Sequence, residues 1–174
     1  MKKIASDENY RALENKAKSG LNFDLSEIKS ETNKLLELLG ETMYSFMEER
    51  KDTPTAHEGF LRRIGAPILV RPSDAEGSLF QLVQRVRYLC FSEDMVAEHP
   101  MILRRAVENI FKVADKLELD AELAAEYGSF EMTVDGNSRK SAEYRAARAF
   151  KEQALKIYQL TDAILNNYEE NSLQ

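Results

Sequence analysis

Arginine is the residue of this chain whose placement most suggests chemistry. The sequence holds twelve arginines and twelve lysines, and eleven of the arginines fall between residues 50 and 148. A guanidinium group contacts phosphate or carboxylate through parallel hydrogen bonds, so a cluster of arginines favours an anionic partner. The candidate contact residues are seven arginines from the middle of the chain: Arg62, Arg63, Arg71, Arg85, Arg87, Arg104 and Arg105.

The distribution of charge leaves two roles open for these arginines. The segment 60–112 is locally positive, whereas the segments 1–59 and 113–174 are both acidic. The simpler interpretation is that the arginines form ion pairs with the acidic flanks inside one fold. The alternative is a basic face that meets an acidic protein or the backbone of a nucleic acid without reading its bases.

Histidine and cysteine are too few to indicate a metal centre. His57 and His99 are the two histidines and Cys90 is the one cysteine, and none of them falls at a zinc-ligand spacing. No glycine-rich phosphate-binding loop is present either. We therefore predict no metal, no cofactor and no catalytic residue. Cys90 lies in an apolar run and is predicted to be a small buried hydrophobe rather than a nucleophile.

Arg50 and His57 form one weak enzymatic pattern, because six residues separate them. The pair resembles the Arg…His signature of the HEPN toxins and nucleases, a family of helical ribonucleases. The resemblance covers these two residues alone, and Lys51 differs from the polar amide or acid usual beside that arginine. It implies RNA cleavage that depends on His57. In the simpler interpretation Arg50 is a cation at a helix end and His57 is exposed on a connector.

Composition places the chain among single-domain helical proteins. It has 174 residues, a net charge of −6 and 43% hydrophobic residues, enough to bury one core. An acidic balance argues against a general nucleic-acid coat. The first residues are polar, and no apolar run approaches the roughly 18 residues that span a bilayer. We expect a soluble, cytoplasmic protein that does not enter a membrane.

Hydrophobic periodicity predicts an all-α bundle of five to seven helices. Two long amphipathic helices are expected at 25–51 and 139–168, packed antiparallel around a central, largely buried helix at 74–91. Asp24 is predicted to cap the first of them. Gly40 interrupts that helix, and a close helix crossing is one explanation for it.

Several shorter features complete the predicted fold as one domain over 1–174. Pro100 opens a helix whose apolar stripe runs through Leu117, and Gly65 ends a short helix that Thr53-Pro54 begins. Asp135-Gly136 is expected to turn the chain. The remaining predictions are a peripheral N-terminal helix within 1–20, a frayed tail at 169–174, and a tiny two-stranded β ribbon between 68–70 and 130–134.

These observations favour a non-enzymatic protein-interaction module, such as an adaptor, an inhibitor or a regulatory subunit. Its expected partner is another protein or further copies of itself, because the apolar stripes are wider than a simple helix pair needs. The second hypothesis is a helical subunit that binds nucleic-acid backbone through the central arginines. The third is the HEPN-like ribonuclease.

Overall fold

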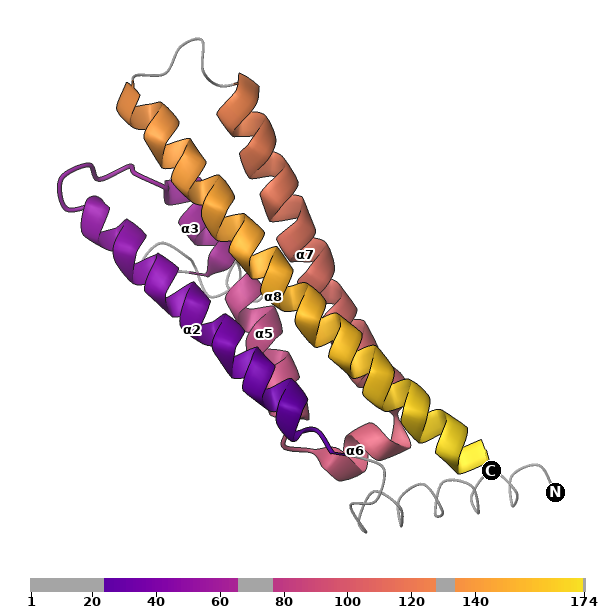
Figure 1. The fold of residues 1–174 in the computed structure, drawn as a ribbon. Coiled ribbons are helices and arrows are strands. Elements are labelled where there is room, and N and C mark those ends of the chain that lie inside the picture. The colour runs from indigo at the N-terminus through magenta and orange to yellow at the C-terminus, as the bar shows by residue number, and fades with distance from the viewer. Residues whose placement is uncertain (1–23, 66–76, 128–133, 174) are drawn as a thin grey trace.

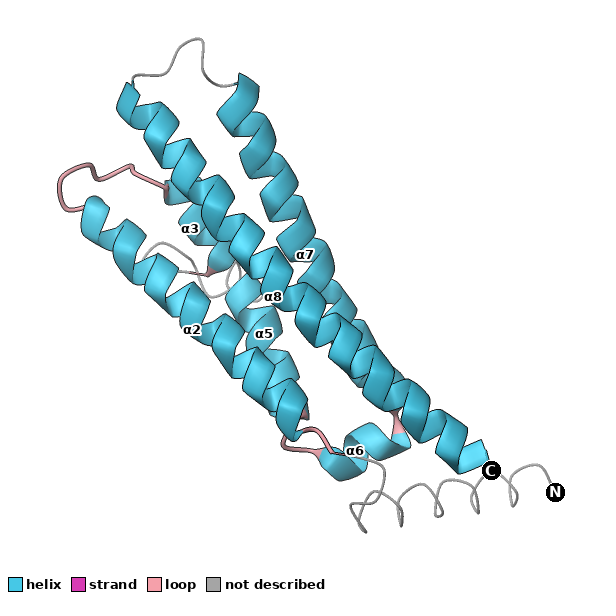
Figure 2. Ribbon diagram, in the orientation of Figure 1, coloured by secondary structure: helices cyan, strands magenta, loops and turns pink. Residues whose placement is uncertain are grey.

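The computed structural model describes residues 24–65, 77–127 and 134–173, and it shows an all-α protein across these ranges. The helices are α2 (Ser26–Glu49), α3 (Glu58–Ile64), α5 (Leu79–Leu89), α6 (Glu93–Glu98), α7 (Pro100–Tyr127) and α8 (Val134–Leu173) (Figures 1 and 2). The predicted all-α bundle is confirmed. The predicted N-terminal helix lies outside the described residues, as do 68–70 and 130–133 of the β ribbon.

Four of the helices form an up-down-up-down bundle. Helices α2, α5, α7 and α8 follow one another in space as they do in sequence, and α8 closes the ring by packing against α2 (Figure 1). Each therefore runs antiparallel to its two neighbours. The short helices lie at opposite ends of the bundle, α3 beside the end of α2 and α6 beside the start of α7.

The core of the bundle is formed by one apolar stripe from each long helix. In α7 the predicted stripe is buried along its full length, from Leu103 through Ile110 to Leu117. Phe150 of α8 is the largest fully buried side chain among the described residues, and it stacks on Phe60 of α3 with ring centres 6.4 Å apart. The 3.6-residue period therefore predicted the buried face of α7 correctly.

Polar contacts fix α8 against both of its neighbours. The side-chain amide of Gln153 donates to the backbone oxygen and the carboxylate of Glu31 on α2, at 2.9 and 2.7 Å. On the other side, Lys151 lies 2.8 Å from Asp115 of α7. Because Gln153 is buried, these two hydrogen bonds satisfy a group that would otherwise oppose folding.

Helix ends follow local signals in the sequence. The N-cap of α2 is Leu25 rather than the predicted Asp24, whose carboxylate accepts a hydrogen bond from the backbone N–H of Ser26 at 2.9 Å, which lowers the pKa of Asp24. Ser78 caps α5 by accepting from the N–H of Gln81 at 3.3 Å. Gly65 ends α3 as predicted, in the left-handed region at φ 103° that glycine adopts readily.

The structure corrects several of the predicted elements. There are three long helices among those described, since α7 has 28 residues and α8 has 40, about 60 Å. The expected turn at Asp135-Gly136 lies inside α8, and α3 begins at Glu58 rather than at Pro54. The helix predicted at 74–91 is not central, because α5 forms one corner of the bundle and exposes Tyr88.

Gly40 does not mark a helix crossing. It is exposed on α2, and a Cβ atom added there would meet nothing within 4 Å. The glycine is therefore not required by packing at this position.

None of the helices in these ranges has an apolar stretch long enough to cross a bilayer.

Candidate functional site

Three of the predicted arginines form ion pairs within the fold. Arg63 joins α3 to Asp120 of α7 at 2.9 Å, and Arg62 pairs with Glu58 one turn earlier in α3 at 3.0 Å. Arg104 joins α7 to Asp162 of α8 at 3.3 Å and donates to Asn166 at 2.9 Å. These contacts match the simpler interpretation, in which arginines neutralise the acidic flanks.

The remaining arginines do not form one cluster with them. Arg71 lies outside the described residues. Arg104 and the Arg63 partner Asp120 are sixteen residues apart on α7, a distance of about 24 Å along the helix. Arg85 and Arg105 are exposed and form no ion pair with any described residue. Arg87 is half-buried, with its guanidinium carbon 5.8 Å from the ring centre of Phe91.

The outer face of α5 and α6 carries a group of exposed apolar side chains. Tyr88 is 79% exposed, Phe91 is 61% exposed and Met95 is 40% exposed. A helix advances about 100° per residue, so burial of Leu79, Val83 and Val86 directs Tyr88 away from the core. We call Arg85, Tyr88, Phe91 and Met95, with the surface hollows beside them, the α5–α6 face.

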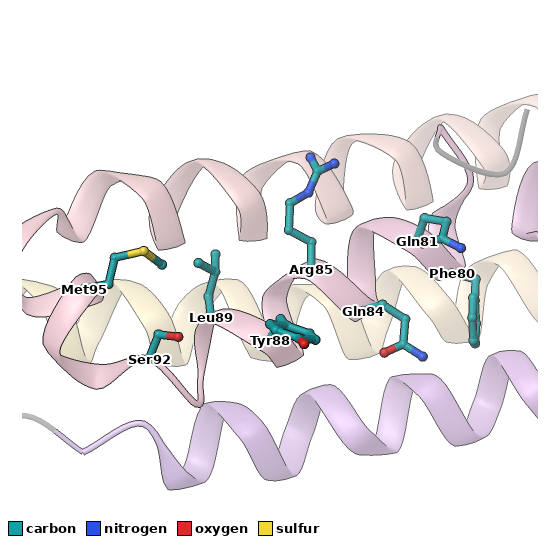
Figure 3. Close-up of a pocket in the computed structure, with 8 residues that line it drawn as sticks. All are labelled: Phe80, Gln81, Gln84, Arg85, Tyr88, Leu89, Ser92 and Met95. Atoms are coloured by element: carbon teal, nitrogen blue, oxygen red, sulfur yellow. The ribbon is translucent and has the colours of Figure 1, made fainter. Parts of the chain in front are cut away.

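Two hollows lie side by side on this face. The first has a volume of about 580 Å³ and includes Arg85, Tyr88 and Met95 in its lining (Figure 3). The second, of about 590 Å³, includes Lys29, Phe91 and Met95. In Figure 3, Tyr88 lies between Met95 at one end of the first hollow and Phe80 at the other. Together the hollows offer recesses bordered by exposed apolar groups.

Charge is divided along the α5–α6 face. Arg85 is exposed on α5 and lines the first hollow, whereas Lys29 of α2 lines the second hollow and lies 3.9 Å from the Phe91 ring centre. Acidic groups lie on α6, where Glu93 and Asp94 are exposed and line the second hollow. Among the described residues, neither carboxylate forms an ion pair. The face therefore has Arg85 at one end and, at the other, the carboxylates of Glu93 and Asp94 beside Lys29, with apolar groups between the two ends.

Cys90 lies beneath this face and is buried, as the sequence predicted. Burial raises the pKa of its thiol to about 11. The thiolate is the nucleophilic form of cysteine, and a raised pKa disfavours it at neutral pH. The environment of Cys90 is thus that of a packing residue.

A second candidate centre surrounds His57, which is buried rather than exposed on the connector. Its Nε2 lies 2.7 Å from a carboxylate oxygen of Glu49 in α2, and its Nδ1 lies 3.1 Å from Glu143 in α8. The imidazole stacks on Phe46, with ring centres 3.8 Å apart. Its backbone is left-handed at φ 56°, which is uncommon for a residue with a side chain.

Two cations complete the network around His57. Arg139 donates to Glu49 at 2.7 Å and to the hydroxyl of Thr53 at 3.1 Å, and Lys140 lies 3.5 Å from Glu143. The hydrogen bond from Arg139, together with that from His57, lowers the pKa of Glu49. We call these residues the His57 network.

The geometry of the His57 network is that of a structural clamp. It ties the end of α2 and the connector to α8, beside a cavity of about 280 Å³. The His57 side chain has no exposed surface, and both of its nitrogens are occupied. Arg50 turns elsewhere and donates to the backbone oxygen of Pro54 at 2.7 Å. In this structure the two residues of the HEPN-like pair therefore contact different partners.

A metal ion would not fit the same network. The two carboxylates approach opposite nitrogens of one imidazole, so they do not converge on a single point. Elsewhere in the described part of the chain, no three His, Cys, Asp or Glu side chains gather as metal ligands would.

Neither the α5–α6 face nor the His57 network is evident in the sequence, for identifiable reasons. His57 was expected to be exposed, because nothing near it in sequence announces Glu143, 86 residues away. The apolar pattern predicts a largely buried helix that includes Tyr88 and Phe91, although Tyr88 lies off the apolar stripe of α5 and Phe91 follows the end of that helix. Their position outside the apolar stripe was the signal in the sequence that they are exposed. No protein-family model, curated protein or solved structure matches this chain, so its candidate sites are defined by their geometry alone.

Proposed function

We propose that this protein is a non-enzymatic protein-interaction module that binds its partner through the α5–α6 face. Such a module acts as an adaptor, an inhibitor or a regulatory subunit. The observation that carries the proposal is the exposure of Tyr88, Phe91 and Met95 together beside two adjoining surface hollows.

The composition of the face supports this role. Tyrosine, phenylalanine, methionine and arginine are the side chains enriched in protein interfaces, and here they share one surface. Exposing apolar groups together costs solvation free energy, which a bound partner would recover. Tyr88 has few rotatable bonds, so it loses little conformational freedom when it inserts into a partner. The rest of the bundle serves as a rigid support.

The proposal is tested by comparing wild type with Tyr88→Ser and Tyr44→Ser as baits in affinity purification. Tyr44 is the matched control, because it is 71% exposed but lies on α2 and lines neither hollow. We expect wild type and Tyr44→Ser to retain the same protein. Removing a central aromatic anchor costs about 2 kcal/mol or more of binding free energy, so Tyr88→Ser should lose that protein. Equal retention by all three baits would contradict the proposal.

Nucleic-acid binding is the second candidate, and it rests on Arg85 and Arg105. Both are exposed and form no ion pair with the described residues, so their charges are available to phosphate. The test is binding of labelled single-stranded RNA, single-stranded DNA and duplex DNA at low and physiological salt. Steeply salt-dependent binding that the double variant Arg85→Glu/Arg105→Glu abolishes would favour this candidate. Absence of binding at low salt would exclude it.

A further inference from the structure

We infer that the partner of the α5–α6 face is a second copy of this chain, bound through the same face in a two-fold symmetric dimer. The inference rests on the proposed function, because it names the occupant of the same surface. The observation behind it is the order of charges along the face, which makes the surface complementary to itself.

A two-fold axis through a surface exchanges the two ends of that surface. Residue i of one copy then meets residue j of the other, and j meets i. On the α5–α6 face, Arg85 lies on α5 and Glu93 and Asp94 lie on α6. An axis near Tyr88 and Met95 brings Arg85 of each copy towards the two carboxylates of its partner. The apolar groups of both copies then meet in the middle.

The charged groups at both ends are unsatisfied in the single chain. The side chains of Arg85, Glu93 and Asp94 are exposed and form no hydrogen bond or ion pair with the residues described in this structure. By contrast, Arg62, Arg63 and Arg104 each have an acidic partner within the fold. The unpaired cation and the unpaired carboxylates thus border the same exposed apolar groups. That combination provides both an apolar contact and a fixed register for a symmetric pair.

The hollows give the apolar side chains a place to enter. The two hollows are contiguous, since Ser92 and Met95 line both. In the symmetric pair, Tyr88 of one copy projects towards the hollow beside Met95 of the other, and the second tyrosine does the same in return. Both aromatic rings are then removed from water at once. A face of this kind needs no partner other than the chain itself.

The test is the mass of the full chain in solution, measured by analytical ultracentrifugation at physiological salt from about 1 to about 100 µM, where weak dimers dissociate. We expect wild type to move from the 19.9 kDa monomer to twice that mass as concentration rises. Arg85→Glu places like charges opposite each other and should weaken dimerisation on the order of tenfold or more. The double variant Glu93→Arg/Asp94→Arg should weaken it similarly.

Charge exchange makes the test specific to this arrangement. Combining Arg85→Glu with Glu93→Arg and Asp94→Arg restores opposite charges across the axis, so the triple variant should dimerise again. Arg105→Glu is the matched control, because Arg105 is exposed and unpaired among the described residues but lines neither hollow. It should dimerise as wild type does. Circular dichroism of each variant confirms that the helices are retained.

Three results would overturn the inference: a wild type that stays monomeric throughout, an Arg85→Glu variant no weaker than Arg105→Glu, or a triple variant that does not recover. A monomeric wild type that still retains another protein through Tyr88 would remove the dimer and leave the proposed function standing. A dimer that survives every charge variant, with no Tyr88-dependent partner, would remove both.

Discussion

His57 shows how one residue can hold three segments of this chain together. Its ring is fully buried between Glu49 of α2 and Glu143 of α8, and it stacks on Phe46. Glu143 is itself buried, and its carboxylate contacts His57 and Lys140. A buried carboxylate that loses such a partner keeps the cost of its desolvation.

Replacing His57 with Ala should therefore destabilise the protein by about 2–4 kcal/mol, because it removes two hydrogen bonds and an aromatic contact and leaves Glu143 under-satisfied. Urea unfolding followed by circular dichroism measures the change in the free energy of unfolding. His99→Ala is the control, since His99 is exposed at the end of α6 and should change stability by less than about 0.5 kcal/mol. Similar losses in the two variants would show that the network does not stabilise the fold.

Two glycines, Gly40 in α2 and Gly65 at the end of α3, affect their helices in opposite ways. Gly40 lies in the interior of α2, where its backbone is helical and its surroundings are open. Gly65 ends α3 at φ 103°, and an added Cβ would lie 2.6 Å from the Ser78 hydroxyl oxygen and 2.9 Å from Cβ of Phe80. The first glycine weakens its helix, whereas the second allows α3 to stop and the chain to pass close to α5.

The two alanine substitutions should accordingly have opposite signs. Gly40→Ala restricts the unfolded chain and fits the helix without a clash, so we expect a gain of about 0.5–1 kcal/mol in the free energy of unfolding. Gly65→Ala forces a left-handed backbone and a steric clash, so we expect a loss of more than about 1 kcal/mol. Thermal and urea unfolding of both variants provide the measurement. A destabilised Gly40→Ala would mean that packing on this side of α2 is closer than the structure shows.

Carboxylates govern the response of the whole molecule to acid. The pKa of Glu49 is lowered by hydrogen bonds from Arg139 and His57, and that of Glu31 is lowered by Lys34 and Gln153. Both groups connect α2 to α8. A carboxyl whose pKa is lower in the folded than in the unfolded state stabilises the fold above its unfolded value of about 4.5. That contribution disappears as pH falls through the folded pKa.

Stability should therefore fall as the pH drops below about 5, and Glu49→Gln should make this fall shallower. The variant should be less stable than wild type at pH 7 and approach it in strongly acidic solution, where Glu49 of wild type is protonated. Urea unfolding across this pH range measures the difference. Glu48→Gln is the control, because it removes the same charge one residue away without touching His57 or Arg139. A constant gap between wild type and Glu49→Gln at every pH would contradict the assignment.

Contacts between residues close in the chain specify the helices of this protein. The all-α class, the existence of α2 and α7, the stop at Gly65 and the burial of the stripe from Leu103 to Leu117 all follow from the 3.6-residue period and from capping residues close in the chain. Each of these features depends on neighbours within a few positions. Such neighbours are visible in a single sequence.

The packing of the helices against one another determines which side chains meet across the bundle. His57 and Glu143 are 86 residues apart in sequence, and Arg139 and Glu49 are 90 apart. The choice of neighbouring helices determines that Arg104 pairs with Asp162 while Arg85 stays exposed. It also determines whether Tyr88 faces solvent or the core. A helical period fixes the apolar side of each helix but not the partner of its polar side, because that partner comes from the packing of the whole bundle.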